Sequence, residues 1–321
     1  MIRIAGAGLA GLATAWELVK RGSEVTVHDA AEPGAGSVSR YAGGMLAPFC
    51  EGESAPEDVV RMGRRAAAWW AETTPVTRRG TLVVAPPRDR SELTRFARRT
   101  TGHQTVSGAE IAALEPALAG RFSQGLFFAE EAHLDPRRAL RDLAALLQRR
   151  GVDIRYSTRA PAQVDLVCTG GAAQVPELRP VRGEMALLQA PEVGITRTLR
   201  LLHPRVPLYL VPRGAGVCMI GATMIESGST RPITLRSLSE LLNAAYALHP
   251  GLAEASVIET GAGLRPAFPD NLPRLLRHDG ALHLNGLYRH GFLLAPAMAA
   301  RAADLLISET CHADHRQRHT A

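Results

Sequence analysis

The sequence predicts an α/β protein in two parts, one built on a mainly parallel sheet and the other an α+β unit on a mainly antiparallel sheet. A strand–helix–strand pattern opens the chain over residues 2–29, and a helix followed by two strands recurs over residues 135–171. Residues 207–224 instead follow the pattern of a hairpin with a glycine-rich turn. Helices that alternate with strands favour a parallel sheet, whereas strands joined by a short turn favour an antiparallel one.

The first unit carries the glycine pattern of a dinucleotide-binding site. An apolar strand over residues 2–5 directly precedes the motif GAGLAG at residues 6–11, and the second strand ends at Asp29. In such a unit Gly6 permits the tight turn, Gly8 lets N–H groups approach a pyrophosphate, and Gly11 allows close helix packing. The helix N-terminus favours the phosphates, and we expect Asp29 to accept hydrogen bonds from ribose hydroxyls.

The segment after Asp29 favours FAD over a nicotinamide cofactor. Residues 30–48, AAEPGAGSVSRYAGGMLAP, are rich in glycine and serine and show neither a helical nor a strand period. A nicotinamide dehydrogenase would usually continue with regular βα units. Small residues and free backbone donors suit a second stretch laid along the cofactor, although a plain surface loop is the alternative.

The middle of the chain alternates short helices and strands that carry no chemistry of their own. Ser107, with Glu110 three residues later, has the pattern of a capping box. The adjacent Trp69 and Trp70 are expected to pack in the core rather than to form a binding platform. The expected elements are a helix over 56–72, a strand over 80–87 and short helices over 91–100 and 107–118.

Asp135 begins the segment that returns the chain to the first sheet. It is a good N-cap before Pro136, and the helix is expected to end at Gly151. Both domains are therefore predicted to be discontinuous. The predicted limits are residues 1–45, 131–180 and 255–310 for the dinucleotide-binding domain, 46–130 and 181–254 for the substrate domain, and 311–321 for a polar tail.

Four side chains outside the glycine motif are candidates for ligand contacts. Tyr209 and Met224 flank the predicted hairpin, Arg265 precedes a proline-rich turn, and Arg289 stands just before an apolar helix pattern. A guanidinium group can hold a carboxylate through two parallel hydrogen bonds, and a tyrosine hydroxyl can add a third. Surface positions for the arginines and a half-buried structural role for Tyr209 are the alternatives.

These segments resemble a known enzyme family. The N-terminal blocks resemble the D-amino acid oxidase superfamily of FAD enzymes, and residues 209–224, 263–273 and 285–297 are similar to glycine oxidases of the thiamine-biosynthesis type. The resemblance implies a Rossmann-like FAD-binding domain of the D-amino acid oxidase and glutathione-reductase-like type, with a substrate domain over the flavin. It also implies that Tyr209 and Arg265 contact the substrate carboxylate, that Met224 lines a small pocket, and that Arg289 lies near substrate and flavin.

The same resemblance implies which residues contact FAD. A cysteine used for covalent flavin attachment in monomeric sarcosine oxidases has no counterpart in residues 263–273, so we expect dissociable FAD. We also expect Gly286 and Gly291 to let the backbone pass close to the ring, and Pro296 to fall early enough in its helix to cost little. The implied FAD contacts are Gly6, Gly8, Leu9, Ala10, Gly11, Asp29, Ala30, Val38, Ser39, Gly43, Gly44, Met45, Gly170, Leu287, Tyr288, Arg289, His290, Gly291, Phe292 and Leu293.

The activity that the resemblance implies is oxidation of glycine or another small amino acid by hydride transfer to flavin N5. The hydride transfer would turn the amino acid into an imine for the thiazole of thiamine, and oxygen would then reoxidise the flavin and give hydrogen peroxide. The resemblance also implies thiazole synthase as a partner and a homo-oligomeric enzyme. Three alternatives are open: a membrane-linked amino acid dehydrogenase of the cyanide-forming type, a tRNA-modifying FAD oxidoreductase, and a flavin-binding protein without turnover. Arg40 and Tyr41 depart from the small residues usual near the flavin.

Composition narrows the remaining classes. The net charge is +6, but Lys20 is the only lysine and the arginines are scattered among acidic residues, which argues against a nucleic-acid face and against Schiff-base chemistry. Four dispersed cysteines, no recognisable signal peptide and no apolar run close to the ~20 residues of a membrane span predict a cytoplasmic protein. The histidine-rich end, residues 311–319, is interpreted as a frayed tail rather than a metal site.

Overall fold

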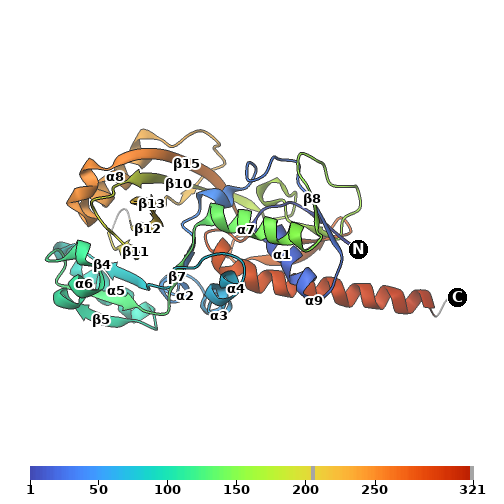
Figure 1. The fold of residues 1–321 in the computed structure, drawn as a ribbon, viewed down its shortest axis with the longest axis horizontal. Helices are drawn as coiled ribbons and strands as arrows, with labels where there is room; N and C mark the ends of the chain where they lie inside the picture. Colours follow the sequence, from blue (N-terminus) through green and yellow to red (C-terminus); the bar gives the residue numbers. More distant parts are fainter. Residues whose placement is uncertain (204–206, 319–321) are drawn as a thin grey trace.

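The computed structural model describes residues 1–203 and 207–318, and side chains as far as Glu309. Two sheets lie next to each other, and one long C-terminal helix runs along and beyond the first of them (Figure 1). The first sheet is parallel except where its last two strands pair as a hairpin. Its six strands, in spatial order, are β16 (Arg274–His278), β17 (Ala281–Asn285), β9 (Leu166–Val167), β1 (Ile2–Ala5), β2 (Val25–His28) and β8 (Asp153–Arg155).

Helices α1 (Leu9–Lys20), α7 (Pro136–Arg149) and α9 (Gly291–Arg318) pack together with this sheet around one apolar core. The predicted cap of α7 is confirmed, because the Asp135 carboxylate accepts hydrogen bonds from the first N–H groups of the helix. At the far end of α1, Lys20 pairs with the carboxylates of Glu17 and Glu72.

The helix predicted over residues 56–72 is two helices, α3 (Glu57–Gly63) and α4 (Ala66–Ala71), preceded by the short α2 (Pro48–Glu51). The break follows Gly63, where a β-carbon would lie 2.7 Å from the Leu293 side chain, so α3 touches α9 directly. Trp69 and Trp70 are both buried, which confirms their expected role in packing.

The second sheet is mainly antiparallel, with one parallel pair between β4 and β11. Along its main path it contains β14 (Ile225–Glu226), β10 (Arg179–Gln189), β13 (Val217–Gly221), β12 (Leu208–Gly214), β11 (Thr198–Leu201), β4 (Thr81–Val84), β6 (Gln124–Phe128) and β5 (Gln104–Ser107), and β15 (Ser256–Ala267) pairs with β10. The helices of this half are α5 (Arg90–Arg99), α6 (Gly108–Leu114) and α8 (Leu235–Leu248). The capping box of Ser107 and Glu110 is present at α6.

The predicted domain limits differ from these sheets in three places. Strand β15 belongs to the second sheet, although residues 255–310 were assigned to the first unit. Helices α3 and α4 pack against α9, although residues 46–130 were assigned to the second unit. Helix α9 continues to Arg318, past the expected start of the tail at residue 311, and the side chains beyond Glu309 lie outside the described part.

Helix α9 is the one described helix that is long and apolar enough, over Gly291–Glu309, to meet the length and composition of a membrane span. More than half of that segment is buried inside the protein, as in the core helix of a soluble protein. The expectation that no apolar run approaches this length was therefore wrong, and packing against α1 and α4 explains why the helix is apolar.

Pro296 lies beyond the first turn of α9, so the expectation that its missing N–H costs little was incomplete. The carbonyl of Phe292, four residues earlier, loses its helical donor. The indole N–H of Trp70 donates to this carbonyl at 2.8 Å instead. A buried tryptophan thus replaces the hydrogen bond that the proline removes.

Candidate active site

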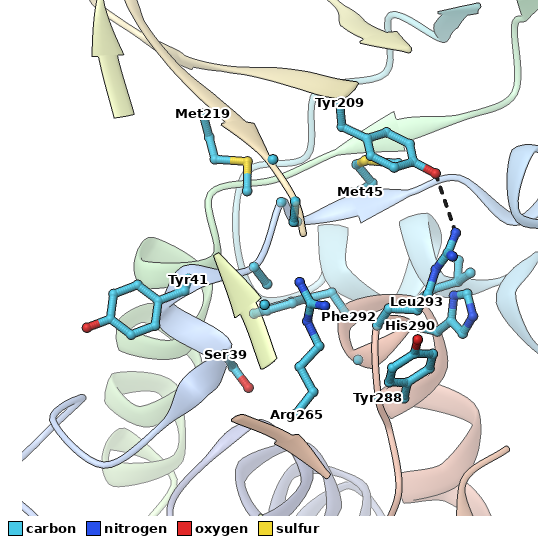
Figure 2. Close-up of a pocket in the computed structure, with 18 of the residues that line it drawn as sticks. Ser39, Tyr41, Met45, Tyr209, Met219, Arg265, Tyr288, His290, Phe292 and Leu293 are labelled. Carbon is cyan, nitrogen blue, oxygen red and sulfur yellow. Dashed lines mark hydrogen bonds between the residues drawn. The ribbon is translucent and has the colours of Figure 1, made fainter. Parts of the chain in front are cut away.

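A cavity is lined by residues from both sheets, and Figure 2 shows side chains pointing into it from several separate elements. The segment over residues 38–51 forms one side, and it begins with the short 3-10 helix η1 (Val38–Tyr41) and contains strand β3 (Met45–Leu46), which pairs with β7 (Ala132–His133). The other sides of the cavity are formed by strands β10, β13 and β15 and by the turn before α9. The cavity is therefore a place where segments far apart in the chain converge.

The glycine motif lies at the N-terminus of α1 and is shaped to leave room for a ligand. Gly6 has φ of +103°, and a β-carbon on Gly11 would lie 1.9 Å from the Gly6 carbonyl oxygen, so neither position accepts a side chain without moving the turn. Gly8 caps the helix with no side-chain hydrogen bond. The first N–H groups of α1 are thus available to an anion, which fits the diphosphate of a dinucleotide.

Asp29 also belongs to this turn. Its carboxylate accepts hydrogen bonds from the backbone N–H of Ala7 at 2.7 Å and of Ala31 at 2.9 Å. These bonds fix the turn, and a carboxylate has lone pairs left for further donors. Its role toward a ribose stays a prediction.

The predicted FAD contacts divide into two groups by position. One group lines the cavity, and the other lies around the glycine motif and strand ends, outside it. Lining residues are Leu9, Val38, Ser39, Gly43, Gly44, Met45, Tyr288, Arg289, His290, Gly291, Phe292 and Leu293. Residues outside the lining are Gly6, Gly8, Ala10, Gly11, Asp29, Ala30, Gly170 and Leu287.

Gly286 is required by packing within the protein. A β-carbon there would lie 2.4 Å from the ring of Phe268, and the residue does not line the cavity. Gly291 does line it, where a β-carbon would lie 2.9 Å from Leu9. Packing against Phe268 thus favours a glycine at this position, and the expected approach of the backbone to a ring stays a prediction.

Arg265 points into the middle of the cavity from β15 (Figure 2). Its guanidinium crosses over Gly183 of β10, where a β-carbon would lie 2.1 Å from Nη2, and Nη1 donates to the Thr223 carbonyl at 3.0 Å. Burial, and to a smaller extent the charge of Arg289, lower the pKa of Arg265 to about 10. No carboxylate of the described residues forms an ion pair with it, so its remaining donors are directed at the cavity.

Arg289 has different surroundings. It donates to the Glu51 carboxylate at 2.5 Å, and its Nη2 also lies 3.5 Å from the Tyr209 hydroxyl. Tyr209 donates to the other oxygen of Glu51 at 3.3 Å, and the Met224 sulfur lies 3.4 Å from Arg289 Nη1. The structure thus joins Tyr209, Met224 and Arg289 in one cluster, with Arg265 on another wall of the same cavity.

Glu51 is ionised despite its burial. Burial raises the pKa of its carboxyl, but the charges of Arg289, of His290 when it is protonated at low pH, and of Arg200 outweigh that effect and hold the pKa at about 2. In the same cluster, burial is the main cause that lowers the pKa of His290; with the opposing effect of Glu51 and the further lowering by Arg289 included, the pKa is about 4. His290 is therefore neutral at pH 7, with its Nδ1 3.4 Å from Glu51.

Sequence reasoning missed several residues that line the cavity. Arg200 is buried and stacks on the Tyr209 ring at 4.8 Å, and the Glu184 carboxylate is paired with Arg182 at 2.7 Å. Glu51 stands in a segment with no motif, and Arg200 lies in a strand that was not predicted, so no local pattern marked them. The missed lining residues include Glu51, Glu184, Arg200 and Met219, whereas Tyr41, which was expected near the flavin, does line the cavity.

Comparison with known proteins agrees with this arrangement. The chain matches the DAO family, described as FAD dependent oxidoreductase, over residues 2–305. It is 53% identical to the candidate thiamine biosynthesis oxidoreductase ThiO of Rhizobium etli, covering 98% of this chain and 99% of that one. The glycine oxidase of Pseudomonas putida is 28% identical, covering 94% of this chain and 93% of that one.

Two further comparisons concern a fused protein and the fold. The bifunctional ThiO/ThiG protein of a Nostoc species is 30% identical, over 96% of this chain and 53% of the fused protein. The crystal structure of glycine oxidase from Geobacillus kaustophilus has the same fold, with a TM-score of 0.80 at 23% identity over 96% of this chain and 94% of that one. The glycine cradle at α1 and the match along nearly the whole chain lead to one conclusion: this chain belongs to the DAO family of FAD-dependent oxidoreductases.

Proposed function

We propose that this enzyme oxidises glycine or a similarly small amino acid to its imine. The observation that carries the proposal is Arg265, a half-buried guanidinium that faces the cavity and has no carboxylate partner among the described residues. A cation that is partly removed from water and has no counter-ion is destabilised, and a substrate carboxylate would supply that counter-ion through two parallel hydrogen bonds. The glycine oxidase name of the Pseudomonas putida relative supports the same substrate class.

The residues of the site position the substrate rather than exchange protons with it. Arg265 would hold the carboxylate, and Tyr209 and Met224 would close the space beyond Cα, which limits the size of the side chain. The substrate amine reacts in its neutral form, so no side-chain base is required. FAD, which the glycine motif and the cavity would hold, would supply the chemistry of a two-electron oxidant that oxygen can regenerate.

We further propose that the imine serves in forming the thiazole of thiamine. Two relatives support this step by their names: the Rhizobium etli protein is described as a thiamine biosynthesis enzyme, and the Nostoc protein joins ThiO to ThiG in one chain. Thiazole synthase is then the expected partner. The enzyme itself is expected to be cytoplasmic and homo-oligomeric and to bind FAD without a covalent bond. Flavin that stays on the polypeptide after acid denaturation would refute non-covalent binding.

Anaerobic mixing of the holoenzyme with single amino acids tests the proposal. Glycine, sarcosine and D-alanine are expected to bleach the long-wavelength flavin band, whereas large D-amino acids leave it unchanged. Oxygen consumption with glycine then separates an oxidase from a dehydrogenase, which would reduce a dye but not oxygen. Absence of bleaching by every small amino acid would contradict the proposal.

A further inference from the structure

The cavity contains two arginines in opposite electrostatic states. Arg289 is neutralised by Glu51, and the pair is strengthened by the Tyr209 hydroxyl on the same carboxylate. Arg265 bonds only a backbone carbonyl, that of Thr223, among the contacts of the described residues. Both guanidinium groups line the same cavity. Two carboxylate-binding forks are thus present, but one of them is already occupied by the protein.

The occupied fork lies beside the exposed Met224. Met224 touches Arg289 through its sulfur, and 52% of the Met224 residue is exposed to solvent. A substrate whose first carboxylate binds Arg265 would extend any second group toward the remaining walls, where Arg289, Glu51 and Tyr209 lie. If that second group is uncharged, it meets an ion pair with no net charge. If it is a carboxylate, the negative charge of Glu51 repels it.

Several neighbouring side chains hold the Glu51 carboxylate against Arg289. It is 7% exposed, and Arg289, Tyr209 and His290 all approach its two oxygens. It remains charged through the whole physiological pH range because cations surround it. At Arg289 Nη2, a ligand carboxylate would have to displace the Glu51 carboxylate, which is covalently part of the site and so competes at very high local concentration.

We propose that Glu51 determines substrate specificity: by occupying Arg289 it restricts the site to amines with one carboxylate and excludes amines with two. Iminodiacetate and other N-carboxymethyl amino acids are the class that it would exclude. The inference rests on the proposed function for its substrate, because Arg265 must bind the first carboxylate. Removal of the Glu51 charge should convert Arg289 into a second carboxylate site.

Binding of two non-oxidisable acids to the holoenzyme tests the inference. Diglycolate carries a second carboxylate, and methoxyacetate has a methyl ether in its place; both lack an amine, so calorimetric titration reports affinity without turnover. The wild-type enzyme should bind methoxyacetate more tightly than diglycolate. Glu51→Gln should raise the affinity for diglycolate relative to methoxyacetate about tenfold or more, because a repelling charge is lost and a cation is freed.

Two variants separate this effect from a general change in charge. Glu53→Gln removes the same charge two residues away, where the carboxylate pairs with Arg200 and Arg99 instead, and it should leave the ratio of the two affinities unchanged. Adding Arg289→Met to Glu51→Gln should abolish the gain for diglycolate. An equal shift in Glu53→Gln, or a gain that survives loss of Arg289, would overturn the proposal.

The wild-type ratio keeps the test decisive if Glu51→Gln fails to fold. Tighter binding of diglycolate than of methoxyacetate by the wild-type enzyme would by itself overturn the inference. Oxidation of glycine and iminodiacetate is measured in parallel. If the enzyme oxidises neither glycine nor iminodiacetate but the affinity ratios are as expected, the proposed function is contradicted and the specificity inference stands. If the enzyme oxidises glycine but Glu51→Gln leaves the affinity ratio unchanged, the specificity inference is contradicted and the proposed function stands.

Discussion

The glycine turn at residues 6–11 and the Arg289–Glu51 cluster are both binding regions, but they are built in different ways. The turn is one short stretch of chain between β1 and α1, and its shape depends on the absence of side chains. The cluster joins residues 238 positions apart in the chain, and its shape depends on charges that compensate one another. The first region is specified by local sequence and the second only by the complete fold.

This difference predicts how each region responds to substitution. A glycine turn has no alternative way to accommodate a β-carbon, so a single change should abolish binding of the cofactor. A charged cluster shares its interactions among several side chains, so most single changes should alter selectivity or rate in degrees. The predictions below test this contrast, beginning with the largest effect.

Gly11→Val should eliminate most FAD binding. A β-carbon at this position lies 1.9 Å from the Gly6 carbonyl oxygen, so α1 must move away from the turn. The ratio of flavin to protein absorbance in the purified enzyme should fall below about one tenth of the wild-type value, since overpacking costs roughly 1–3 kcal/mol or more. Gly228→Ala, where the nearest atom is 3.5 Å away, is the control and should retain its flavin.

Arg265→Ala should keep FAD and lose activity. Removal of the guanidinium group that binds the substrate carboxylate is expected to lower kcat/KM for glycine about 10²–10³-fold, corresponding to roughly 3–4 kcal/mol. Arg265→Lys keeps the charge but not the fork, and it should lose less. Steady-state oxygen consumption measures both, and a change of less than threefold in Arg265→Ala would show that the carboxylate binds elsewhere.

Trp70→Phe tests how the protein compensates for Pro296 in α9, because the variant leaves the Phe292 carbonyl without a donor. The free energy of unfolding should decrease by about 1–3 kcal/mol in urea titrations. A second change, Pro296→Ala, restores a backbone N–H to this carbonyl and should recover part of the loss. If the double variant is no more stable than Trp70→Phe, the indole hydrogen bond is not what compensates the proline.

Glu131→Gln should change how stability depends on pH. Burial is the main reason that the pKa of Glu131 is raised from 4.5 to about 7, while its Oε1 accepts from the Cys50 N–H at 2.7 Å. Between these values the folded protein binds more protons at this site than the unfolded chain, so this group makes stability fall as pH rises from 4.5 through 7. In the glutamine variant, the loss of stability between pH 5 and pH 8 should be smaller by about 2 kcal/mol. Urea titrations at both values measure it, and equal losses in variant and wild type would contradict the raised pKa.

Met224→Leu should have the smallest effect. Its sulfur is a weak acceptor for Arg289, and the side chain stands at the exposed edge of the cavity. A substitution of similar volume should change kcat/KM for glycine less than about threefold. A tenfold loss would show that Met224 contacts the substrate as closely as the family resemblance implies.

The sequence predicted the parts of the fold that have local signals. The motif before α1, the Asp135 cap of α7 and the capping box of α6 each lie within a few consecutive residues, and the structure contains all three. Strands β5, β6 and β11 were missed because their pairing comes from the sheet rather than from a pattern in the chain.

The candidate site was predictable only where a resemblance supplied the residues. Arg265, Arg289, Tyr209 and Met224 all line the cavity, although their roles remain predictions. Glu51 could not be predicted, because an acidic residue in a polar stretch looks like a surface residue until the fold places it against Arg289. A buried ion pair is a property of two distant segments, and neither segment alone contains a sign of it.

The single lysine has a practical consequence. Lys20 stands at the opposite end of α1 from Leu9, which lines the cavity, and twelve residues of helix separate the two ends by about 18 Å. Among the side chains of this sequence, amine-reactive reagents therefore have one target, Lys20. Coupling through Lys20 would attach the enzyme to a sensor chip at the end of α1 that is remote from the cavity, so immobilised binding assays could be done without an added tag.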